Sequence, residues 1–178
     1  MILTGPEIDR ERAEGRLRLE PYDKEHLSTN SYDLTLGSEL VCYTADVLDT
    51  RRPNPHRTVP IPPDGFVLRP DRIYLGASVE VLGSNAYVPL IHSRSGAARL
   101  GLYVHCTADL IDVGSFGQVT FQLRAVQPVR VHAGDLLGQV TFWRTHGEIT
   151  LYDGKYQGSR GPQPSRIHRD APALQEAG

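Results

Sequence analysis

The residues best suited to chemistry in this sequence begin at residues 93–96, which read SRSG, and extend to Arg99. Arg94 and Arg99 flank Ser95 and Gly96, an arrangement that suits an anionic ligand. A guanidinium group matches phosphate oxygens in pairs, and a glycine lets backbone N–H groups approach a ligand closely. The alternative is that both arginines are ordinary surface charges. The clustering of these residue types favours a phosphate-binding turn.

Three further polar residues, His105, Asp112 and Gln122, follow in the same stretch of sequence. The Asp112 carboxylate could activate a water molecule. Asp112 also begins the tripeptide Asp-Val-Gly, and residues of these types commonly form a simple turn. The stretch therefore combines an anion site with a candidate base, while a purely structural interpretation of Asp112 stays open.

The C-terminal segment, residues 152–170, reads YDGKYQGSRGPQPSRIHRD and fits no regular element. Lys155, Arg160 and Arg166 make it cationic, and three glycines give it conformational freedom. One interpretation is a frayed basic terminus. The other is a lid that closes over a polyanionic ligand and becomes ordered when phosphate neutralises its charge.

The composition limits the classes of protein to which this chain can belong. With 178 residues and 39% hydrophobic content, we expect a single domain spanning residues 1–178. A formal net charge of −2 argues against a general nucleic-acid-binding protein, which needs a strong positive balance. Cys42 and Cys106 lack metal-ligand spacing, and no run of about eighteen apolar residues occurs. We therefore expect a cytoplasmic protein that binds neither nucleic acid nor membrane.

Short strands must position these residues. Segments rich in β-branched and aromatic residues recur between Gly, Pro, Asn and Asp, which is typical of an all-β sandwich or barrel. The alternation at residues 30–40 predicts a half-buried strand with Asp33 on its solvated side. A capping box at residues 4–7 predicts a short helix through about residue 14, and residues 95–100 predict another. The other expected strands are residues 16–22, 72–81, 86–92, 102–106, 118–125, 129–133 and 139–144, with a long loop or edge crossings at 50–71.

Four motifs recur in the order and spacing of a known family. They are SYDLTLG at residues 31–37, SRSGAARLGLYVHCTADLID at 93–112, AGDLLGQVTF at 133–142 and GKYQGSRGPQPSRI at 154–167. With them, the sequence resembles the superfamily of dCTP deaminases and trimeric dUTPases, in particular the deaminase branch that includes bifunctional enzymes.

The resemblance implies an all-β, distorted jelly-roll-like fold with a short N-terminal helix and a flexible, phosphate-closing tail at about residues 154–178. It also implies a homotrimer with active sites between subunits and a nucleoside triphosphate substrate. Mg²⁺ would arrive with that substrate, held by phosphate oxygens and water, as suits an ion that keeps its hydration. No residue of the chain is then expected to be a metal ligand.

The resemblance also implies roles for individual positions. Asp112 would lie by the sugar and the catalytic water, where the aspartate of dUTPases activates water. The implied substrate-binding residues are Arg94, Ser95, Gly96 and Arg99 for the phosphates, His105, Thr107 and Ala108 for the base and sugar, and Lys155, Tyr156 and Gln157 for closure over the triphosphate.

Departures from the family pattern gather at the base end of the expected site. Gln122 stands where deaminases of this family carry the glutamate that shuttles protons, and a carboxamide cannot transfer a proton at neutral pH. Val113 and Ser115 replace the usual proline and aromatic residue, and Phe116 is displaced by one position. Gly96 matches the form of the turn found in dUTPases. The phosphate end is thus intact beside an altered base end.

Three hypotheses follow for the function. The preferred one is a Mg²⁺-dependent diphosphatase that cuts a nucleoside triphosphate with a pyrimidine or modified base into monophosphate and diphosphate, with Asp112 activating water. The second is a dCTP deaminase that acts despite Gln122, with His105 or another group supplying the proton path. The third is a catalytically silent nucleotide-binding protein.

Overall fold

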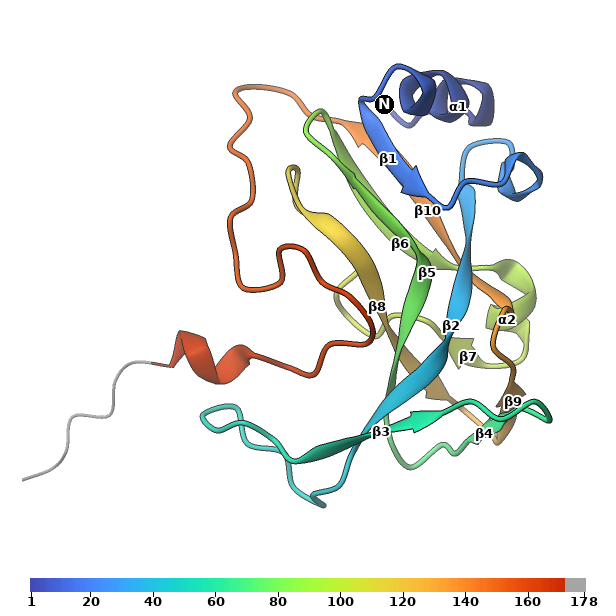
Figure 1. The fold of residues 1–178 in the computed structure, drawn as a ribbon, viewed down its shortest axis with the longest axis vertical. Coiled ribbons are helices and arrows are strands. Elements are labelled where there is room, and N and C mark those ends of the chain that lie inside the picture. The colour runs from blue at the N-terminus through green and yellow to red at the C-terminus, as the bar shows by residue number, and fades with distance from the viewer. Residues whose placement is uncertain (172–178) are drawn as a thin grey trace, which may run out of the picture.

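Antiparallel pairing joins nearly all strands of this protein into one sheet, in a computed structural model that describes residues 1–171. The sheet has the order β6-β10-β2-β5-β8-β7, with β1 paired to β5 and β3 to β2, while β4 and β9 form a separate pair (Figure 1). The predicted all-β class is confirmed. The strands are β1 (Leu17–Glu20), β2 (Tyr32–Tyr43), β3 (His56–Pro60), β4 (Phe66–Leu68), β5 (Tyr74–Ser84), β6 (Tyr87–Ser93), β7 (Leu102–Tyr103), β8 (Phe116–Ala125), β9 (Val129–Val131) and β10 (Leu136–Arg144).

Strand β2 occupies the centre of the sheet, and this position changes one prediction. The alternation at residues 30–40 does form a strand, which continues to Tyr43. Asp33 is nevertheless buried and does not face solvent. Its carboxylate forms an ion pair with Arg94, with 3.0 Å between Oδ2 and Nε. The alternation of apolar and polar residues predicted the strand correctly. It could not show that side chains on both faces of β2 would be buried.

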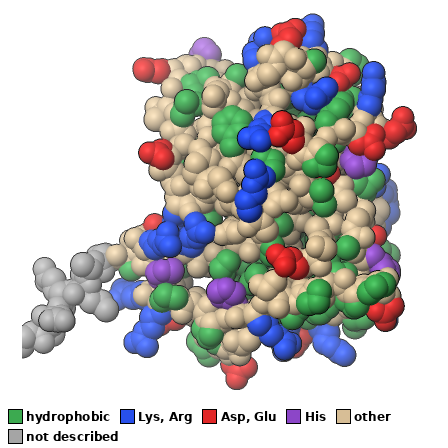
Figure 2. Space-filling view, viewed as in Figure 1, with side chains coloured by type: hydrophobic (Ala, Val, Ile, Leu, Met, Phe, Trp, Pro, Cys, Tyr) green, Lys and Arg blue, Asp and Glu red, His purple; other side chains and the backbone are tan. Residues whose placement is uncertain are grey.

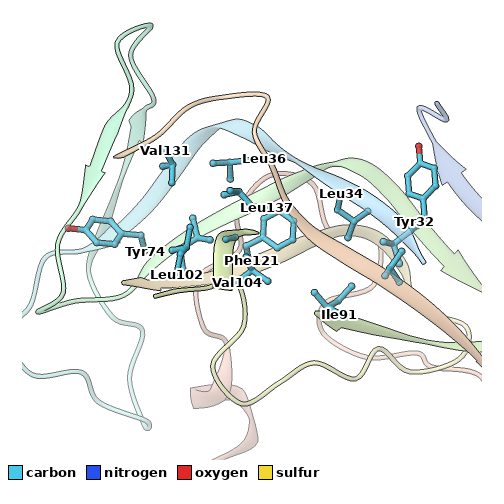
Figure 3. Close-up of a cluster of buried hydrophobic side chains, with 14 of the residues drawn as sticks. Tyr32, Leu34, Leu36, Tyr74, Ile91, Leu102, Val104, Phe121, Val131 and Leu137 are labelled. Atoms are coloured by element: carbon cyan, nitrogen blue, oxygen red, sulfur yellow. The ribbon is translucent and has the colours of Figure 1, made fainter. Parts of the chain in front are cut away.

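The core lies against β2, β8 and β10. Leu34 and Leu36 from β2 pack with Phe121 from β8 and Val140 from β10, and all four side chains are fully buried (Figure 3). Gly138 lets these strands approach, since a Cβ atom there would lie 2.9 Å from the ring of Phe121. Burial of each such side chain stabilises the fold by about 1.5–3 kcal/mol.

Helices are few and short. The first predicted helix is α1 (Gly5–Ala13), and Gly15 with φ 76° follows its end. Thr4 occupies the N-cap position, but its hydroxyl makes no capping hydrogen bond, so the expected capping box does not form. The second predicted helix is α2 (Ser95–Arg99). Two 3-10 helices, η1 (Lys24–His26) and η2 (Ile167–Asp170), were not predicted.

Two segments differ from their predicted form. The proline-rich residues 50–71 contain β3 and β4, so the alternative of edge crossings describes them better than a loop. The strand expected at residues 102–106 ends at Tyr103, and the next residues leave the sheet as a loop. Proline suits the first segment to edge positions, because it donates no ladder hydrogen bond, and in the described chain β3 pairs only with β2 while β4 pairs only with β9.

The chain after β10 crosses the outside of the sheet and runs along β8 (Figure 1). Figure 2 shows Lys, Arg and His side chains gathered at the lower left of the view. Elsewhere on this face basic and acidic side chains alternate. Among residues 1–171, no helix is both long enough and apolar enough to cross a membrane.

Candidate active site

A cavity of about 580 Å³ lies on the outer face of β8, between residues 104–108 and the C-terminal segment. This volume is typical of sites for small ligands. Among the described residues its wall carries no Asp, Glu, Lys or Arg, and apolar surface makes up more of the wall than polar surface. The polar lining consists of Tyr43, His105, Cys106, Thr107, Ser115, Gln118, Thr120, Gln122, Tyr156, Ser159, Gln163 and Ser165.

The pleat of β8 determines which residues face this cavity. Successive side chains of a strand point to opposite faces. Phe121 and Leu123 are therefore fully buried in the core, whereas Gln118, Thr120 and Gln122 line the cavity. Gln122, the predicted position of a proton-transfer residue, thus faces the space where a ligand would lie.

Hydrogen bonds to the neighbouring segment fix the side chain of Gln122. Its backbone N–H donates to the carbonyl of Val104 over 2.8 Å. The backbone N–H of Cys106 donates to Gln122 Oε1 over 3.1 Å. Because an N–H group can only donate, the carboxamide oxygen must face Cys106, and its NH₂ group faces the other way.

His105 lines the cavity beside Gln122 and is half-buried. Its Nδ1 is buried and has no hydrogen-bond partner among residues 1–171. His92 lies close enough to interact with it electrostatically. Burial lowers the pKa of His92, and the charge of His105 lowers it further. The wall thus contains one imidazole with an uncommitted ring nitrogen.

Two other predicted base-site residues, Thr107 and Ala108, line the cavity and are exposed. Asp112 does not line it. This exposed aspartate begins a turn in which its carbonyl accepts a hydrogen bond from Ser115 N–H over 3.1 Å. Gly114 has φ 88° in that turn, a conformation that favours glycine. The role of Asp112 beside sugar and water stays a prediction.

The predicted phosphate turn lies away from the cavity, and none of its residues lines it. Arg94 pairs with the buried Asp33, and burial raises the pKa of that carboxyl group. Arg99 donates from Nη1 to the carbonyl of Ser95 over 3.2 Å and is exposed. Gly96 borders open space, since a Cβ atom there would meet nothing within 4 Å. Within one subunit, this cationic turn and the cavity are separate.

The C-terminal segment is held along β8 by its own backbone. Gln118 N–H donates to Ser159 O over 2.9 Å, and Gln163 N–H donates to Thr120 Oγ1 over 3.1 Å. Gly117 permits this approach, because a Cβ atom there would lie 2.9 Å from Ser159 N. The segment thus forms one wall of the cavity.

The three predicted tail residues differ in their positions. Tyr156 lines the cavity, and its hydroxyl accepts a hydrogen bond from Arg166 N–H over 2.8 Å. Gln157 lies outside it and donates from Nε2 to Gly114 O over 2.7 Å. Lys155 also lies outside and forms an ion pair with Asp170. Closure of this segment over phosphate stays a prediction.

The polar cavity residues that sequence reasoning missed include Gln118, Thr120, Ser159 and Gln163. The signal for the first two was present, because Gln118, Thr120 and Gln122 recur with the period of a strand. No local signal marks the other two, since they reach the cavity through contacts with β8 that are distant in sequence.

Comparison with known proteins places the chain among nucleotide-modifying enzymes. A family description, dCTP deaminase-like, matches residues 2–145. A protein of Clostridium beijerinckii named dCTP deaminase, dUMP-forming, is 40% identical over 171 residues, 96% of this chain and 98% of the relative. A protein of the same name from Leptospira biflexa is 41% identical over the same shares.

A solved structure supports the fold alone. The crystal structure of 2'-deoxycytidine 5'-triphosphate deaminase from Agrobacterium tumefaciens superposes with a TM-score of 0.64 at 22% identity. The match covers 82% of this chain and 48% of that chain, so this chain spans about half the length of that protein. The predicted dCTP deaminase fold is thereby confirmed.

These names contradict the preferred functional hypothesis. A diphosphatase as the main activity is wrong, because relatives matched along 96% of the chain are named dCTP deaminases, as in the second hypothesis. The departures at Gln122, Val113, Ser115 and Gly96 were a poor guide to function, since a few positions were given more weight than the likeness of the whole sequence. With a family description over residues 2–145 and two relatives at about 40% identity, this chain belongs to the dCTP deaminase-like family.

Proposed function

We propose that this protein is an enzyme that removes the 4-amino group of dCTP and, like the relatives named above, forms dUMP, so that dCTP and two water molecules give dUMP, ammonia and diphosphate. The observation that carries the proposal is the match along 96% of the chain to two dCTP deaminases. The cavity on β8 supports it, because about 580 Å³ is enough for a pyrimidine and its sugar. Polar side chains on its wall suit an uncharged base.

A triphosphate needs cations that the cavity wall does not supply. We infer a homotrimer in which Arg94, Ser95 and Arg99 of a second copy reach the phosphates at the mouth of the cavity. The support is that this turn is cationic, partly exposed and separate from the cavity of its own subunit. Gly96 adds open space for the approach of a phosphate group.

The charges of the C-terminal segment fit a similar role. Lys155 pairs with Asp170, which is exposed. Exposed ion pairs contribute only about 0–1 kcal/mol, so a phosphate group could replace this partner at little cost. Tyr156 and Gln157 would then hold the segment against the bound nucleotide.

Mg²⁺ would be bound by substrate phosphates and water, where it neutralises phosphate charge. The chemistry of the available donors fits this arrangement. Among residues 1–171, no three His, Cys, Asp or Glu side chains are grouped so that they could hold a metal ion. The cavity wall likewise lacks a carboxylate in the described chain.

Deamination also requires proton transfer. Water adds to C4 of the ring and ammonia leaves, so protons must reach the ring nitrogen and the departing amine. The carboxamide of Gln122 cannot carry them. We assign the proton path to His105, which lines the cavity and has an uncommitted ring nitrogen in the described structure.

An assay of ammonia and dUMP released from dCTP with Mg²⁺ tests the proposal. We expect both products from the wild-type protein. His105→Asn should slow ammonia release by about 10²-fold, a typical contribution of general acid-base catalysis. His56→Asn, at an exposed position on β3, is the matched control. Absence of ammonia from the wild type would reject the deaminase, and an unchanged His105→Asn variant would reject the proton path.

A further inference from the structure

Most hydrogen-bonding groups on the cavity wall already have partners in the protein. Gln118 uses both ends of its carboxamide, accepting from Gly161 N–H over 2.7 Å and donating to Val79 O over 3.1 Å. Gln163 likewise donates to Arg160 O and accepts from Arg166. These two glutamines hold the C-terminal segment in place and offer no free amide group to a ligand.

Gln122 is different, because only one end of its carboxamide is used. Its oxygen accepts the Cys106 N–H over 3.1 Å. Its Nε2 makes no hydrogen bond with residues 1–171. This atom is also not one of the buried polar atoms that lack a partner in that part of the chain, so it is accessible. The side chain lines the cavity, so two N–H donors are open to a ligand there.

The orientation of these donors is fixed by the backbone. If the carboxamide turned over, its NH₂ group would meet the Cys106 N–H, and two donors would oppose each other. An unpaired donor in a partly buried site destabilises the arrangement. Gln122 therefore presents a hydrogen-bond donor to the cavity, where a carboxylate would present an acceptor.

We propose that Gln122 makes this cavity selective for a pyrimidine with a 4-oxo group over one with a 4-amino group. A 4-oxo group accepts the Nε2–H donor, whereas a 4-amino group opposes it with a second donor. The inference rests on the proposed function in one respect, the placing of a pyrimidine nucleotide in this cavity. In that setting the enzyme binds the base of its product more tightly than the base of its substrate.

Binding of two matched nucleotides tests this selectivity. The α,β-imido analogues of dUTP and dCTP are titrated with Mg²⁺ by calorimetry in the cold, and the sample is then assayed for ammonia to correct for conversion. We expect the wild-type protein to bind the dUTP analogue about tenfold more tightly, the ratio of one well-placed hydrogen bond. Gln122→Met, which keeps the shape and removes the donor, should bring the two affinities within about twofold.

Gln122→Glu should reverse the preference, because its carboxylate still accepts the Cys106 N–H and offers the cavity an acceptor. Gln127→Glu adds the same charge at an exposed position just beyond β8 and should leave the wild-type ratio unchanged. Equal affinities in the wild type, or the wild-type ratio in Gln122→Glu, would overturn the inference. A preference for the dUTP analogue without ammonia from dCTP would reject the deaminase and keep the inference.

Discussion

The cavity on β8 and the turn that carries Arg94 and Arg99 are complementary in every respect that matters for a nucleotide. The cavity is partly open to solvent and its wall combines apolar with polar side chains, and the described part of that wall has no arginine or lysine. The turn is cationic and partly exposed, and most of it is the short helix α2, with Arg94 at the N-cap. One suits a base and a sugar, and the other suits phosphates. Since the turn does not line the cavity of its own chain, the proposed homotrimer would let one nucleotide use the cavity of one copy and the turn of another.

The comparison also shows how differently the two regions are held. Cavity residues are fixed by β8, whose opposite face is anchored in the core by Phe121 and Leu123. The side chain of Arg94 is held by its ion pair with Asp33 and by one longer hydrogen bond, from Nη1 to the carbonyl of Leu136 over 3.4 Å. Many contacts therefore fix the shape of the cavity, while few contacts fix the positions of the charged groups in the turn. Predictions that weaken one region at a time can separate these contributions.

Mixing two inactive variants should have the largest effect. Arg99→Ala removes a phosphate contact, and Ala108→Trp fills the cavity without touching the core, because Ala108 is exposed on its wall. We expect each variant alone to lose about 10²-fold or more in ammonia release. In trimers co-expressed at equal ratio, about a quarter of the sites combine one intact cavity with one intact turn, so about a quarter of wild-type activity should return.

The double variant carrying both substitutions in one chain is the control for this mixing experiment. Mixed with the wild type, it dilutes activity but creates no new pairing. If the two single variants, once mixed, stay as inactive as they are alone, the site lies within one subunit and the proposed trimer has no catalytic role.

Gly117→Ala should displace the C-terminal wall of the cavity. The new Cβ would lie 2.9 Å from Ser159 N, closer than real contacts allow, and the hydrogen bond from Gln118 to Ser159 would weaken. We expect faster trypsin cleavage after Arg160 and a KM for dCTP raised by about tenfold. Gly96→Ala is the matched control for cleavage, because its Cβ meets nothing within 4 Å. Equal cleavage rates would mean that the segment is not held at Gly117.

Sequence alone recovered most of the strands, because their periodicity is local. It also indicated that Gln122 and His105 belong to the same site, but only through the family resemblance. The contact between Thr120 and Gln163 joins positions that are distant in sequence, and no local pattern reports such a contact. The prediction that Asp33 faces solvent was wrong for a related reason, since Asp33 pairs with Arg94 and successive residues at the start of β2 are buried on both faces of the strand.

Asp33→Asn should loosen the phosphate turn while sparing the fold. The asparagine can still accept a hydrogen bond from Arg94, but the charge that holds the guanidinium is lost. We expect the KM for dCTP to rise about threefold with little change in kcat, and the free energy of unfolding to change by less than about 1 kcal/mol, since burial already opposes this charge. Asp64→Asn, at an exposed position, should change neither quantity. A fall in kcat with KM unchanged would contradict the positioning of Arg94 by Asp33.

The smallest expected effect is a loss of folding stability in acid, and it arises at Glu11, outside both the cavity and the turn. Glu11 is buried and accepts hydrogen bonds from Arg16 and from Tyr87, which hold its pKa at about 2 against an ordinary value of 4.5. A depressed carboxyl pKa gives stability that is complete above about pH 4.5 and is lost as pH falls towards 2. Because Arg16 is half-exposed, we expect a loss of only about 1 kcal/mol.

Urea unfolding at pH 7 and pH 3 measures this loss of stability. Glu11→Gln should flatten the dependence of stability on pH, while Glu148→Gln, at an exposed position, should not. An equally steep dependence in Glu11→Gln would assign the acid sensitivity to another carboxylate.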